Sequence, residues 1–313
     1  MAPVEFGLEQ YHNEMNLQPS RKQLTKFLES QGYKLGPTVG EGSYSRVKSG
    51  IKICPDGTIA RVACKVINKR KASQDFINRF LPREIEIIRN LEHPNLLGVY
   101  DVFESPDQVF IFTNYCERGD LLDYIKRKGA LPNEKAKRFF SMLVSAIHYL
   151  HSQDISHRDV KCENIFITAN EHIMLGDFGF ARSCRDPATG SRILSDTFCG
   201  SAAYAAPEIL QSVFSQGTPY NPKMYDVWSL GCVLYIMLTG VMPFDDSNIT
   251  LMLQTQQQKR FPIHQFNLRI SAIQLINRML EPDVTRRATI NQVSQSLWLH
   301  EQINPMLYTR VPY

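Results

Sequence analysis

Residues His157 to Asn164 read His-Arg-Asp-Val-Lys-Cys-Glu-Asn. This short segment holds a carboxylate (Asp159), a cation two residues later (Lys161) and a side-chain amide (Asn164), between an amphipathic run and an apolar run. Phosphoryl transfer to a hydroxyl uses a carboxylate that accepts and aims the proton, a cation near the moving group and an oxygen ligand for Mg²⁺. Taken alone, the segment fits a polar surface loop better, because short motif matches are often accidental. The rest of the chain decides between the two interpretations.

Length and composition limit the class of protein. A chain of 313 residues is long enough for one large two-lobed domain or two small ones. The net charge of +4, with Lys and Arg evenly spread, disfavours nucleic acid as a partner. Seven cysteines without a Cys-x-x-Cys pair indicate free thiols in a reducing compartment. No signal pattern, myristoylation site or membrane-spanning run is present, so we expect a cytoplasmic protein, with nuclear access open, and no membrane partner.

The N-terminal residues predict a short helix and little else. Residues 1–19 are aperiodic, and we expect them to be poorly ordered. Ser20 and Gln23 have the spacing of a capping box, and Leu24, Phe27 and Leu28 then recur at helical intervals. Residues 1–32 are therefore expected to form an extension that contains one short helix.

A glycine-rich turn between two strand-like runs follows. Residues 39–47 read Val-Gly-Glu-Gly-Ser-Tyr-Ser-Arg-Val. Glycines allow the tight backbone and close approach that a flap over phosphate requires. Many hairpins contain two glycines, so the signal is weak alone. A dinucleotide fingerprint is disfavoured because a strand, and no helix, follows the glycines.

A lysine within an apolar strand indicates an ion pair. Lys65 ends the sequence Val-Ala-Cys-Lys, and an unpaired buried ammonium is unfavourable by several kcal/mol. Glu84, on a helix predicted to run to about Asn90, is the preferred partner, and Glu86 is the competing one. The alternative is an edge lysine whose charged end reaches solvent, with an exposed glutamate.

Strands end and helices begin near residue 114. Two further strands are predicted at 99–103 and 108–113, and residues 114–119, Asn-Tyr-Cys-Glu-Arg-Gly, fit a hinge. Helices are expected at 120–128 and 133–151. A β-rich lobe followed by a larger helical lobe places the expected ligand site in the cleft between them.

A second acidic motif ends another strand. Asp177 closes the apolar run 173–175 and begins Asp-Phe-Gly, 18 residues after Asp159. A carboxylate there, beside a flexible glycine, is placed to hold a metal ion on a phosphate. The polar segment 182–198 has no periodicity, and such long loops are usually functional or disordered. Further helices are expected at 226–238, 271–280 and 289–297.

From about residue 33 to 300 the chain resembles a eukaryotic protein kinase. The motifs occur in kinase order: Gly40-x-Gly42, Lys65, Glu84, His157-Arg158-Asp159 with Asn164, Asp177-Phe178-Gly179, Ala206-Pro207-Glu208, Asp226 and Arg287. The resemblance implies an α+β bilobal fold, with a small antiparallel N-lobe containing one main helix (33–113), a hinge (114–119) and a larger helical C-lobe (120–300). Residues 301–313 would be a short tail.

The resemblance also implies site residues. The catalytic residues would be Asp159 as base, Lys161 at the γ-phosphate and Asn164. Mg²⁺ would be held by Asn164 and Asp177. ATP would be bound by the flap, the ion pair, the gatekeeper and the hinge side: Val39, Gly40, Glu41, Gly42, Ser43, Tyr44, Ser45, Arg46, Val47, Lys65, Glu84, Thr113, Asn114, Cys116 and Asp120. Glu208 is expected to pair with Arg287 in a structural role.

The same resemblance suggests substrate and regulation. Lys161 and the small Ser201 are typical of Ser/Thr kinases rather than tyrosine kinases, and Asp120 and Glu163 occupy positions that commonly meet an Arg three residues before the target. Thr197 resembles the activation-loop phosphorylation site, which Arg158 and Arg182 would bind, with Ser195 as the next candidate. The alternative is that Thr197 is only a turn or capping hydroxyl.

A narrower resemblance is to the testis-specific serine/threonine kinases of the calcium/calmodulin-dependent group. It is carried by 80–87, 119–122, 161–164, 197–208, 225–231 and 242–249. It implies a role in sperm development, protein substrates, an upstream activating kinase or autophosphorylation, and possible chaperone partners. The rival interpretations are a pseudokinase scaffold, disfavoured by intact Lys65, Asp159, Asn164 and Asp177, and a P-loop enzyme, whose motif is missing.

Overall fold

The computed structural model describes residues 20–186, 188–195, 200–214 and 219–301. The expected disorder of 1–19, the position of Thr197 and the tail 302–313 lie outside these residues. The chain folds as two compact units. The N-terminal unit comprises residues 20–90 and 97–115, and the C-terminal unit comprises residues 91–96 and 116–301. Each unit is described by itself.

The N-terminal unit is built on one antiparallel sheet with the strand order β1-β2-β3-β5-β4. Its strands are β1 (Tyr33–Glu41), β2 (Ser45–Ile53), β3 (Ile59–Asn68), β4 (Val99–Glu104) and β5 (Gln108–Asn114). The register of the edge strand β1 shifts between Leu35 and Thr38. Pro37 lies between them and has no N–H to donate to β2, which explains an irregularity at that point.

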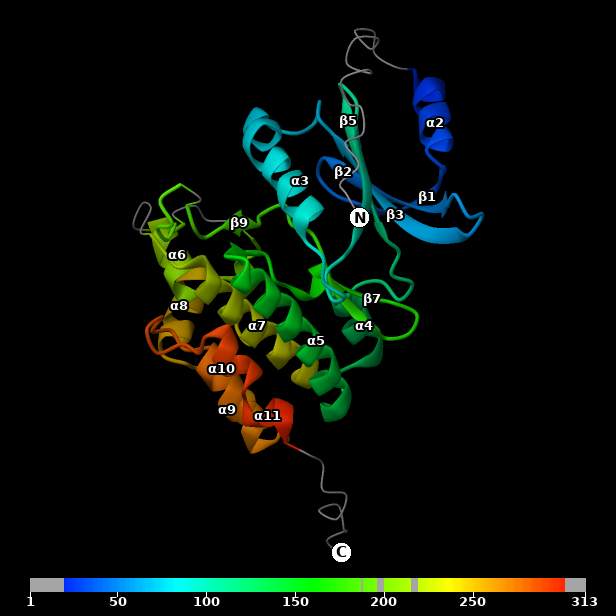
Figure 1. The fold of residues 1–313 in the computed structure, drawn as a ribbon. Coiled ribbons are helices and arrows are strands. Elements are labelled where there is room, and N and C mark those ends of the chain that lie inside the picture. The colour runs from blue at the N-terminus through cyan, green and yellow to red at the C-terminus, as the bar shows by residue number, and fades with distance from the viewer. Residues whose placement is uncertain (1–19, 187, 196–199, 215–218, 302–313) are drawn as a thin grey trace, which may run out of the picture. The chain divides into compact units, whose positions relative to one another are not determined.

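Helices flank this sheet (Figure 1). They are α2 (Arg21–Ser30), the π-helical turn Phe76–Phe80 and α3 (Leu81–Asn90). The predicted capping box at the start of α2 is confirmed: Gln23 N donates to Ser20 Oγ at 3.3 Å, and Ser20 N donates to Gln23 Oε1 at 2.8 Å. These two bonds satisfy N–H groups that a helix start leaves without partners.

Helix α2 belongs to the core of the N-terminal unit. Leu28 is buried with Val62 and Cys64 of β3 and with aromatic side chains of the sheet. Phe27 meets Phe103 edge to face at 5.4 Å. The sequence predicted this helix but not its packing, because helical periodicity shows that a face is apolar without showing what that face contacts.

The C-terminal unit is mainly helical, and α5 and α7 lie side by side in it (Figure 1). Its helices are α4 (Leu121–Lys128), α5 (Asn133–Ser152), α6 (Pro207–Phe214), α7 (Pro222–Thr239), α8 (Ile249–Gln257), α9 (Ile270–Met279), α10 (Ile290–Ser294) and α11 (Leu297–His300). Almost every residue of α7 is buried, so this helix passes through the core of the unit. An antiparallel sheet followed by a helical unit is the predicted α+β fold.

Two short strand pairs in the C-terminal unit frame its loops. The strand β6 (Ile155–Ser156) pairs with β9 (Arg182–Ser183), and β7 (Ile165–Ile167) pairs with β8 (Ile173–Leu175). The 3₁₀ turns are η2 (Cys162–Asn164), η3 (Ala202–Tyr204) and η4 (Ile263–Gln265). The strand β9 lies inside the segment that the sequence analysis treated as an aperiodic loop, where two residues are too few for a periodic signal.

Two helix boundaries differ from the prediction. The last predicted helix, 289–297, is two helices, because Ser296 has an extended backbone as the N-cap of α11. Helix α7 begins at Pro222, four residues earlier than predicted, with the Asn221 side chain accepting from Lys223 N at 3.2 Å. Asn followed by Pro is a recognised helix start that hydrophobic periodicity does not detect.

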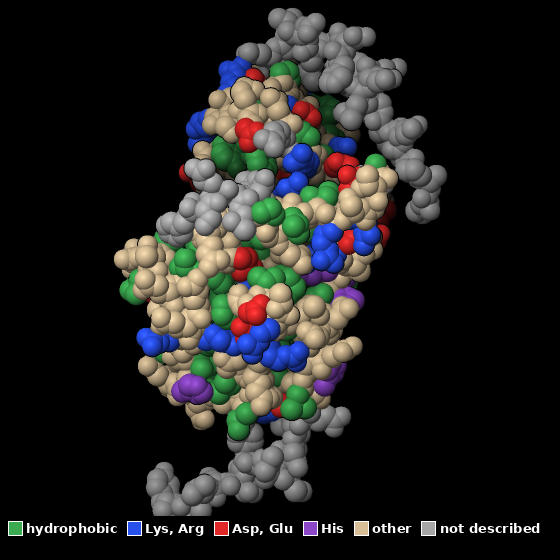
Figure 2. All heavy atoms as spheres, turned by 90° about the vertical axis from the view of Figure 1, so that its left-hand side faces the viewer, with side chains coloured by type: hydrophobic (Ala, Val, Ile, Leu, Met, Phe, Trp, Pro, Cys, Tyr) green, Lys and Arg blue, Asp and Glu red, His purple; other side chains and the backbone are tan. Residues whose placement is uncertain are grey.

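The surface mixes charges of both signs. Figure 2 shows the side of the molecule that carries α6 and α8, where Lys and Arg side chains gather low on the C-terminal unit with acidic side chains among them. Exposed basic residues of this unit include Lys259, which pairs with Glu281 at 2.7 Å. Across the described part of the chain, no helix combines the length and apolarity needed to cross a bilayer.

Candidate active site

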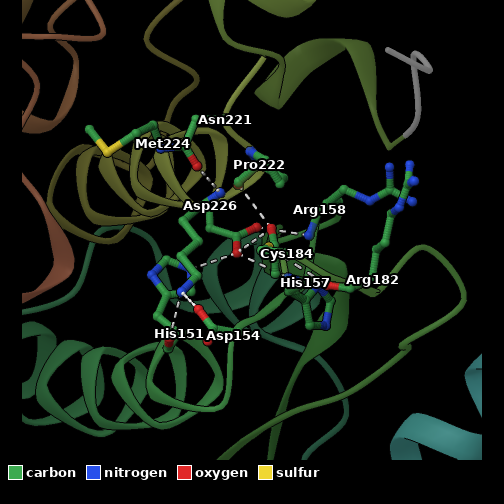
Figure 3. A network of polar contacts seen from close by, with 12 residues as sticks. His151, Asp154, His157, Arg158, Arg182, Cys184, Asn221, Pro222, Met224 and Asp226 are labelled. Atoms are coloured by element: carbon green, nitrogen blue, oxygen red, sulfur yellow. Dashed lines mark hydrogen bonds and ion pairs between the residues drawn. The ribbon is translucent and has the colours of Figure 1, made fainter. Parts of the chain in front are cut away.

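Asp226 of α7 binds the loop between β6 and η2 (Figure 3). The fully buried Asp226 carboxylate accepts from the backbone N–H groups of His157 at 3.0 Å and Arg158 at 2.7 Å. Ser156 Oγ and His151 Nε2 each lie 2.8 Å from its Oδ2. Burial alone would raise the pKa of Asp226, but the bond from His151, its charge and the backbone donors lower it overall. The buried carboxylate therefore fixes the path of the loop.

Arg158 has a strained backbone that this anchor supports. Its φ is +62°, in the left-handed region that side chains other than glycine rarely adopt. Such strain persists only where the surroundings determine the conformation. The short bond from Arg158 N to Asp226 provides that constraint.

His157 joins the loop to the Asp-Phe-Gly segment. Its Nε2 lies 3.0 Å from Gly176 O, and because a carbonyl only accepts, Nε2 carries the proton. Its Nδ1 is then the acceptor for Asp159 N at 3.3 Å. The imidazole also packs on Phe178, with ring centroids 5.0 Å apart. His157 thus sets the position of both acidic motifs.

The two carboxylate oxygens of Asp159 have different surroundings: Oδ2 has polar partners, and Oδ1 has no hydrogen-bond partner among the described residues. Oδ2 lies 2.8 Å from Lys161 Nζ and accepts from Asn164 Nδ2 at 2.9 Å. Oδ1 is buried, and no described residue hydrogen-bonds to it. An unpaired buried carboxylate oxygen is energetically unfavourable, so such a group calls for a functional explanation. The geometry leaves Oδ1 available to accept a proton.

Asn164 and Asp177 are brought together by β7 and β8. Asn164 donates through Nδ2 to both Asp159 O and Asp159 Oδ2 at 2.9 Å. Its backbone oxygen accepts from Gly176 N at 2.9 Å, immediately before Asp177. Asp177 is exposed, and its φ is +58°. The sequence predicted both residues as metal ligands, and the strand pairing places them beside each other.

The N-terminal unit holds the predicted ion pair. Lys65 Nζ lies 3.0 Å from Glu84 Oε1, and the side chains are 25% and 4% exposed. The competing partner Glu86 is exposed. Glu84 lies on the inner face of α3 with Leu81 and Ile88, at i, i+3 and i+7, which excludes the alternative of an exposed glutamate.

The predicted flap is the β1–β2 hairpin. Its turn is closed by Gly42 N donating to Ser45 O at 2.8 Å, and Gly40 lies opposite Val47. Arg46 and Glu41 pair at 3.2 Å, but both side chains are more than 60% exposed, so the pair contributes little stability. The flap residues Val39, Ser43 and Tyr44 lie on the same hairpin, and the Tyr44 ring lies 4.5 Å from the Phe76 ring. One continuous β-hairpin therefore carries all nine predicted flap residues.

The residues predicted at the hinge are divided between the units. Thr113 and Asn114 end β5 in the N-terminal unit, whereas Cys116 belongs to the C-terminal unit. Asn114 Oδ1 accepts from Gly98 N at 2.8 Å, and a Cβ on Gly98 would lie 2.7 Å from that oxygen. Burial, with the charge of Glu117, raises the pKa of the Cys116 thiol to about 12.

Two carboxylates predicted to read the substrate lie near one cysteine. Asp120 is the N-cap of α4 and accepts from Asp123 N at 2.8 Å. Glu163 accepts from the Tyr204 hydroxyl at 3.1 Å. Burial is the main reason why the pKa of the Cys162 thiol is raised to about 12, and the charges of Glu163 and Asp120 also raise it. Both carboxylates are half-buried, and the charge of each contributes to the raised pKa of the Cys162 thiol. Ser201, the third residue predicted to meet the substrate, is the half-buried N-cap of η3.

The arginines predicted to bind a phosphate share a hydroxyl in the described structure. Arg158 Nη1 donates to Ser195 Oγ at 2.6 Å, and Arg182 Nη1 lies 3.5 Å from the same oxygen. Figure 3 shows the two arginine side chains extending in the same direction. Thr197 lies outside the described residues, so the predicted phosphate site itself is not seen.

The comparisons with known proteins agree with this fold and these motifs. Residues 33–299 match the protein kinase domain family. The chain belongs to the protein kinase family and is a serine/threonine protein kinase. Over 275 residues, 87% of the chain, it is 46% identical to testis-specific serine/threonine-protein kinase 1 of Mus musculus (73% of that protein) and 44% identical to testis-specific serine/threonine-protein kinase 3 of Homo sapiens (98% of that protein). It is 35% identical to an SNF1-related protein kinase catalytic subunit of Arabidopsis thaliana over 280 residues, 90% of the chain and 53% of that protein.

Sequence analysis missed two parts of the site. The anchoring of the catalytic loop on Asp226, with His151 and Ser156, was not foreseen, although a carboxylate within a very apolar helix was a visible signal. The contact of Ser195 with the two arginines was also missed. The sequence analysis named Ser195 only as the second candidate for phosphorylation, which does not predict that its unmodified hydroxyl binds the two arginines.

Proposed function

We propose that this kinase transfers the γ-phosphoryl group of ATP to serine or threonine hydroxyls, with Asp159 as the group that orients the hydroxyl and accepts its proton. The observation that carries the proposal is the split environment of the Asp159 carboxylate. Lys161 and Asn164 hold Oδ2, while Oδ1 is buried with no partner among the described residues. A base must lie within hydrogen-bond reach of its proton donor, and Oδ1 is free to do so.

The donor sets fit ATP and Mg²⁺. Asn164 uses Nδ2 in its hydrogen bonds, which leaves its side-chain oxygen, with the adjacent Asp177 carboxylate, as the kind of oxygen ligands that Mg²⁺ prefers. Lys65, oriented by Glu84, would hold the phosphates. ATP with Mg²⁺ supplies the transferable phosphoryl group, and these residues bind and align it.

The substrate class we propose is a protein with Arg three residues before its target. Asp120 and Glu163 support it, because both carboxylates are half-buried and the charges of both contribute to the raised pKa of the Cys162 thiol. An arginine bound between two carboxylates forms charge-assisted hydrogen bonds that lysine matches less well.

The regulation we propose is phosphorylation of Thr197, by the kinase itself or by an upstream kinase. Arg158 and Arg182 support it, since both guanidinium groups reach the same oxygen two residues before Thr197. A phosphate carries about −1.5 to −2 charges and orders a loop by pairing with arginines. The relatives named testis-specific support a role in sperm development. A cytoplasmic location and chaperone partners belong to the proposal through the family resemblance alone.

A peptide assay with matched variants tests this function. Transfer of labelled phosphate to an Arg-x-x-Ser peptide would be measured for wild type, Asp159→Asn and the control Asp186→Asn, an exchange at a carboxylate that caps a turn of another loop. We expect Asp159→Asn to lose about 10²–10⁴-fold in kcat, the usual contribution of a general base, and the control to remain active. Nucleotide binding, followed by fluorescence, should persist in both variants.

Two results would contradict the proposal. Full transfer by Asp159→Asn would remove Asp159 from the reaction. No transfer by wild type, even after an added kinase has phosphorylated Thr197, would favour a scaffold that binds ATP and partners without catalysis.

A further inference from the structure

A buried serine hydroxyl joins the segment after Asp-Phe-Gly to the catalytic loop, in addition to the bond from Arg158 Nε to Phe180 O. Ser195 is fully buried, and its Oγ accepts a short hydrogen bond of 2.6 Å from Arg158 Nη1. Bonds from an ionised donor are shorter and about twice as strong as neutral ones. Arg182 reaches the same oxygen at 3.5 Å, the outer limit of a hydrogen bond.

The backbone of Ser195 is fixed as well. Ser195 N donates to Tyr220 O at 3.0 Å, and Tyr220 N donates to Ser195 O at 2.8 Å. Tyr220 precedes Asn221, the N-cap of α7, and Asp226 of this helix fixes Arg158 N. Both ends of the link between Arg158 and Ser195 are therefore anchored on the start of the same helix, so the position of the hydroxyl is determined on two sides.

The Arg158 guanidinium depends on this hydroxyl. The residue is 5% exposed, and its other side-chain acceptor is Phe180 O, 2.7 Å from Nε. Among the described residues, neither Arg158 nor Arg182 forms an ion pair with a carboxylate. Loss of the Ser195 hydroxyl would leave a buried charged donor without its partner, which is more destabilising than the loss of an exposed bond.

The same segment returns to the reacting carboxylate five residues later. Gly200 has φ +90°, and a Cβ placed on it would lie 2.7 Å from Arg158 O and 3.2 Å from Asp159 Oδ1. The residues on both sides of 196–199 thus contact the catalytic loop. A shift of Ser195 away from Arg158 would move the backbone that packs beside Asp159.

We infer that the Ser195 hydroxyl holds Arg158 and Arg182 while the segment carries no phosphate, so that it positions the catalytic loop for a basal level of transfer before Thr197 is modified. The inference rests on the proposed role of Thr197 and extends it. A phosphate on Thr197 would bring stronger acceptors to the same two arginines and would make the hydroxyl less important. Ser195 is a positioning residue, since it acts through Arg158.

Enzyme treated with a phosphatase, and shown by intact mass to carry no phosphate, provides the test. Three exchanges separate chemistry from size: Ser195→Ala removes the hydroxyl, Ser195→Cys keeps the size with a poor acceptor, and Ser195→Thr keeps the hydroxyl. Ser191→Ala is the matched control, an exposed serine of the same segment whose Oγ forms a hydrogen bond, among the described residues, with the Thr189 hydroxyl.

In the unphosphorylated enzyme we expect Ser195→Ala and Ser195→Cys to lower kcat about tenfold, because each loses one hydrogen bond to a charged group. The KM for ATP should not change. Thr and the control should keep the wild-type value. After an added kinase has phosphorylated Thr197, the difference between Ser195→Ala and wild type should become smaller. A loss confined to kcat, which disappears on phosphorylation, would not follow from a general defect in folding.

Amide hydrogen exchange gives a readout that does not need catalysis. The amides of Ser195 and Tyr220 should exchange faster in Ser195→Ala than in Ser195→Thr. Equal exchange and equal kcat in the unphosphorylated Ala variant and wild type would overturn the inference while leaving the proposed function intact. A wild type that is active only after Thr197 is phosphorylated would overturn it too, as would a phosphate found on Ser195 itself. If no form transfers phosphate, the proposed function fails, and exchange alone then decides whether the hydroxyl holds Arg158.

Discussion

Arg287 forms a bidentate ion pair with Glu208, although the two residues are 79 positions apart in the sequence. Nη1 and Nη2 donate to the two carboxylate oxygens at 2.6 and 2.8 Å. The Arg287 side chain is fully buried and also donates to Glu281 O and Met224 O. This bidentate pair connects the start of α6 to the loop that precedes α10.

Loss of that pair should destabilise the protein. We expect Glu208→Ala to lower the free energy of unfolding by about 3–5 kcal/mol, because it leaves the buried guanidinium without its counter-charge. Arg46→Ala, which removes an ion pair with Glu41 whose side chains are both more than 60% exposed, is the control and should change stability by less than about 1 kcal/mol. Urea unfolding measures both. Equal effects of the two variants would show that the Arg287 pair has no special role.

The pairing of Lys65 with Glu84 should control activity. Lys65→Met should abolish most transfer, since the phosphates would lose their cation. It also leaves the buried Glu84 carboxylate without Lys65, so the variant should unfold at lower urea concentration. The double variant with Glu84→Gln should recover stability but not activity. Recovery of both together, or of neither, would contradict these separate roles.

The proposed preference for arginine in the substrate can be tested with exchanges that keep the hydrogen bonds of the two carboxylates. Asp120→Asn keeps a side-chain oxygen for the cap of α4, and Glu163→Gln keeps an acceptor for the Tyr204 hydroxyl. Each variant should raise the KM for an Arg-x-x-Ser peptide about tenfold through one weakened charged contact, with kcat unchanged. A peptide with Ala in place of Arg is the control, and its kinetics should not respond to either exchange.

Helix α2 should be required for the stability of the N-terminal unit. Leu28→Ala removes a buried side chain from the core around Tyr33 and Phe112, which should lower the free energy of unfolding by about 2–5 kcal/mol. Ser20→Ala should lower it by only about 1 kcal/mol, through loss of the cap. Thermal unfolding distinguishes the two. An unchanged Tm for Leu28→Ala would mean that the helix does not pack on the sheet in solution.

The Glu171 cluster should make stability depend on acid pH. Hydrogen bonds from Lys135 and Arg138 are the main cause of the lowered pKa of Glu171, about 2 against an ordinary 4.5. A lowered pKa in the folded state stabilises the fold above the unfolded pKa, and the effect disappears as pH falls from about 4.5 toward 2. Glu171→Gln should therefore be less stable than wild type near pH 7, with a smaller difference near pH 3. Urea unfolding at both values measures this, and a constant difference would contradict it.

Much of the active site was visible in the sequence because its parts are local. Asp159, Lys161 and Asn164 lie within six residues, and Lys161 and Asn164 both bind Asp159 Oδ2. The strand β3 and helix α3 were recognised from their apolar patterns, so Lys65 and Glu84 could be paired across 19 residues. Glu208 and Arg287 were paired only through the family resemblance, since nothing local connects them.

Contacts that depend on distant packing were not visible. Asp226 binds the backbone N–H groups of Arg158 and His157 from 68 and 69 positions away, and it binds the His151 ring of α5 from 75 positions away. Ser195 meets Arg158 only because an isolated bridge to Tyr220 holds its backbone. A polar residue in sequence shows that a hydrogen bond is possible, but the partner is chosen by the fold that buries both groups.

The sequence by itself determined the class of fold and the order of the motifs, and it named the candidate residues of a phosphoryl-transfer site, since periodicity, turns and motif spacing are properties of short segments. Tertiary structure alone decided which oxygen of Asp159 is held, that helix α2 completes the core of the N-terminal unit, and that a serine occupies the arginine pair near Thr197. These relationships arise because burial removes water as a partner, and each buried polar group must then find its acceptor or donor among residues far away in the chain.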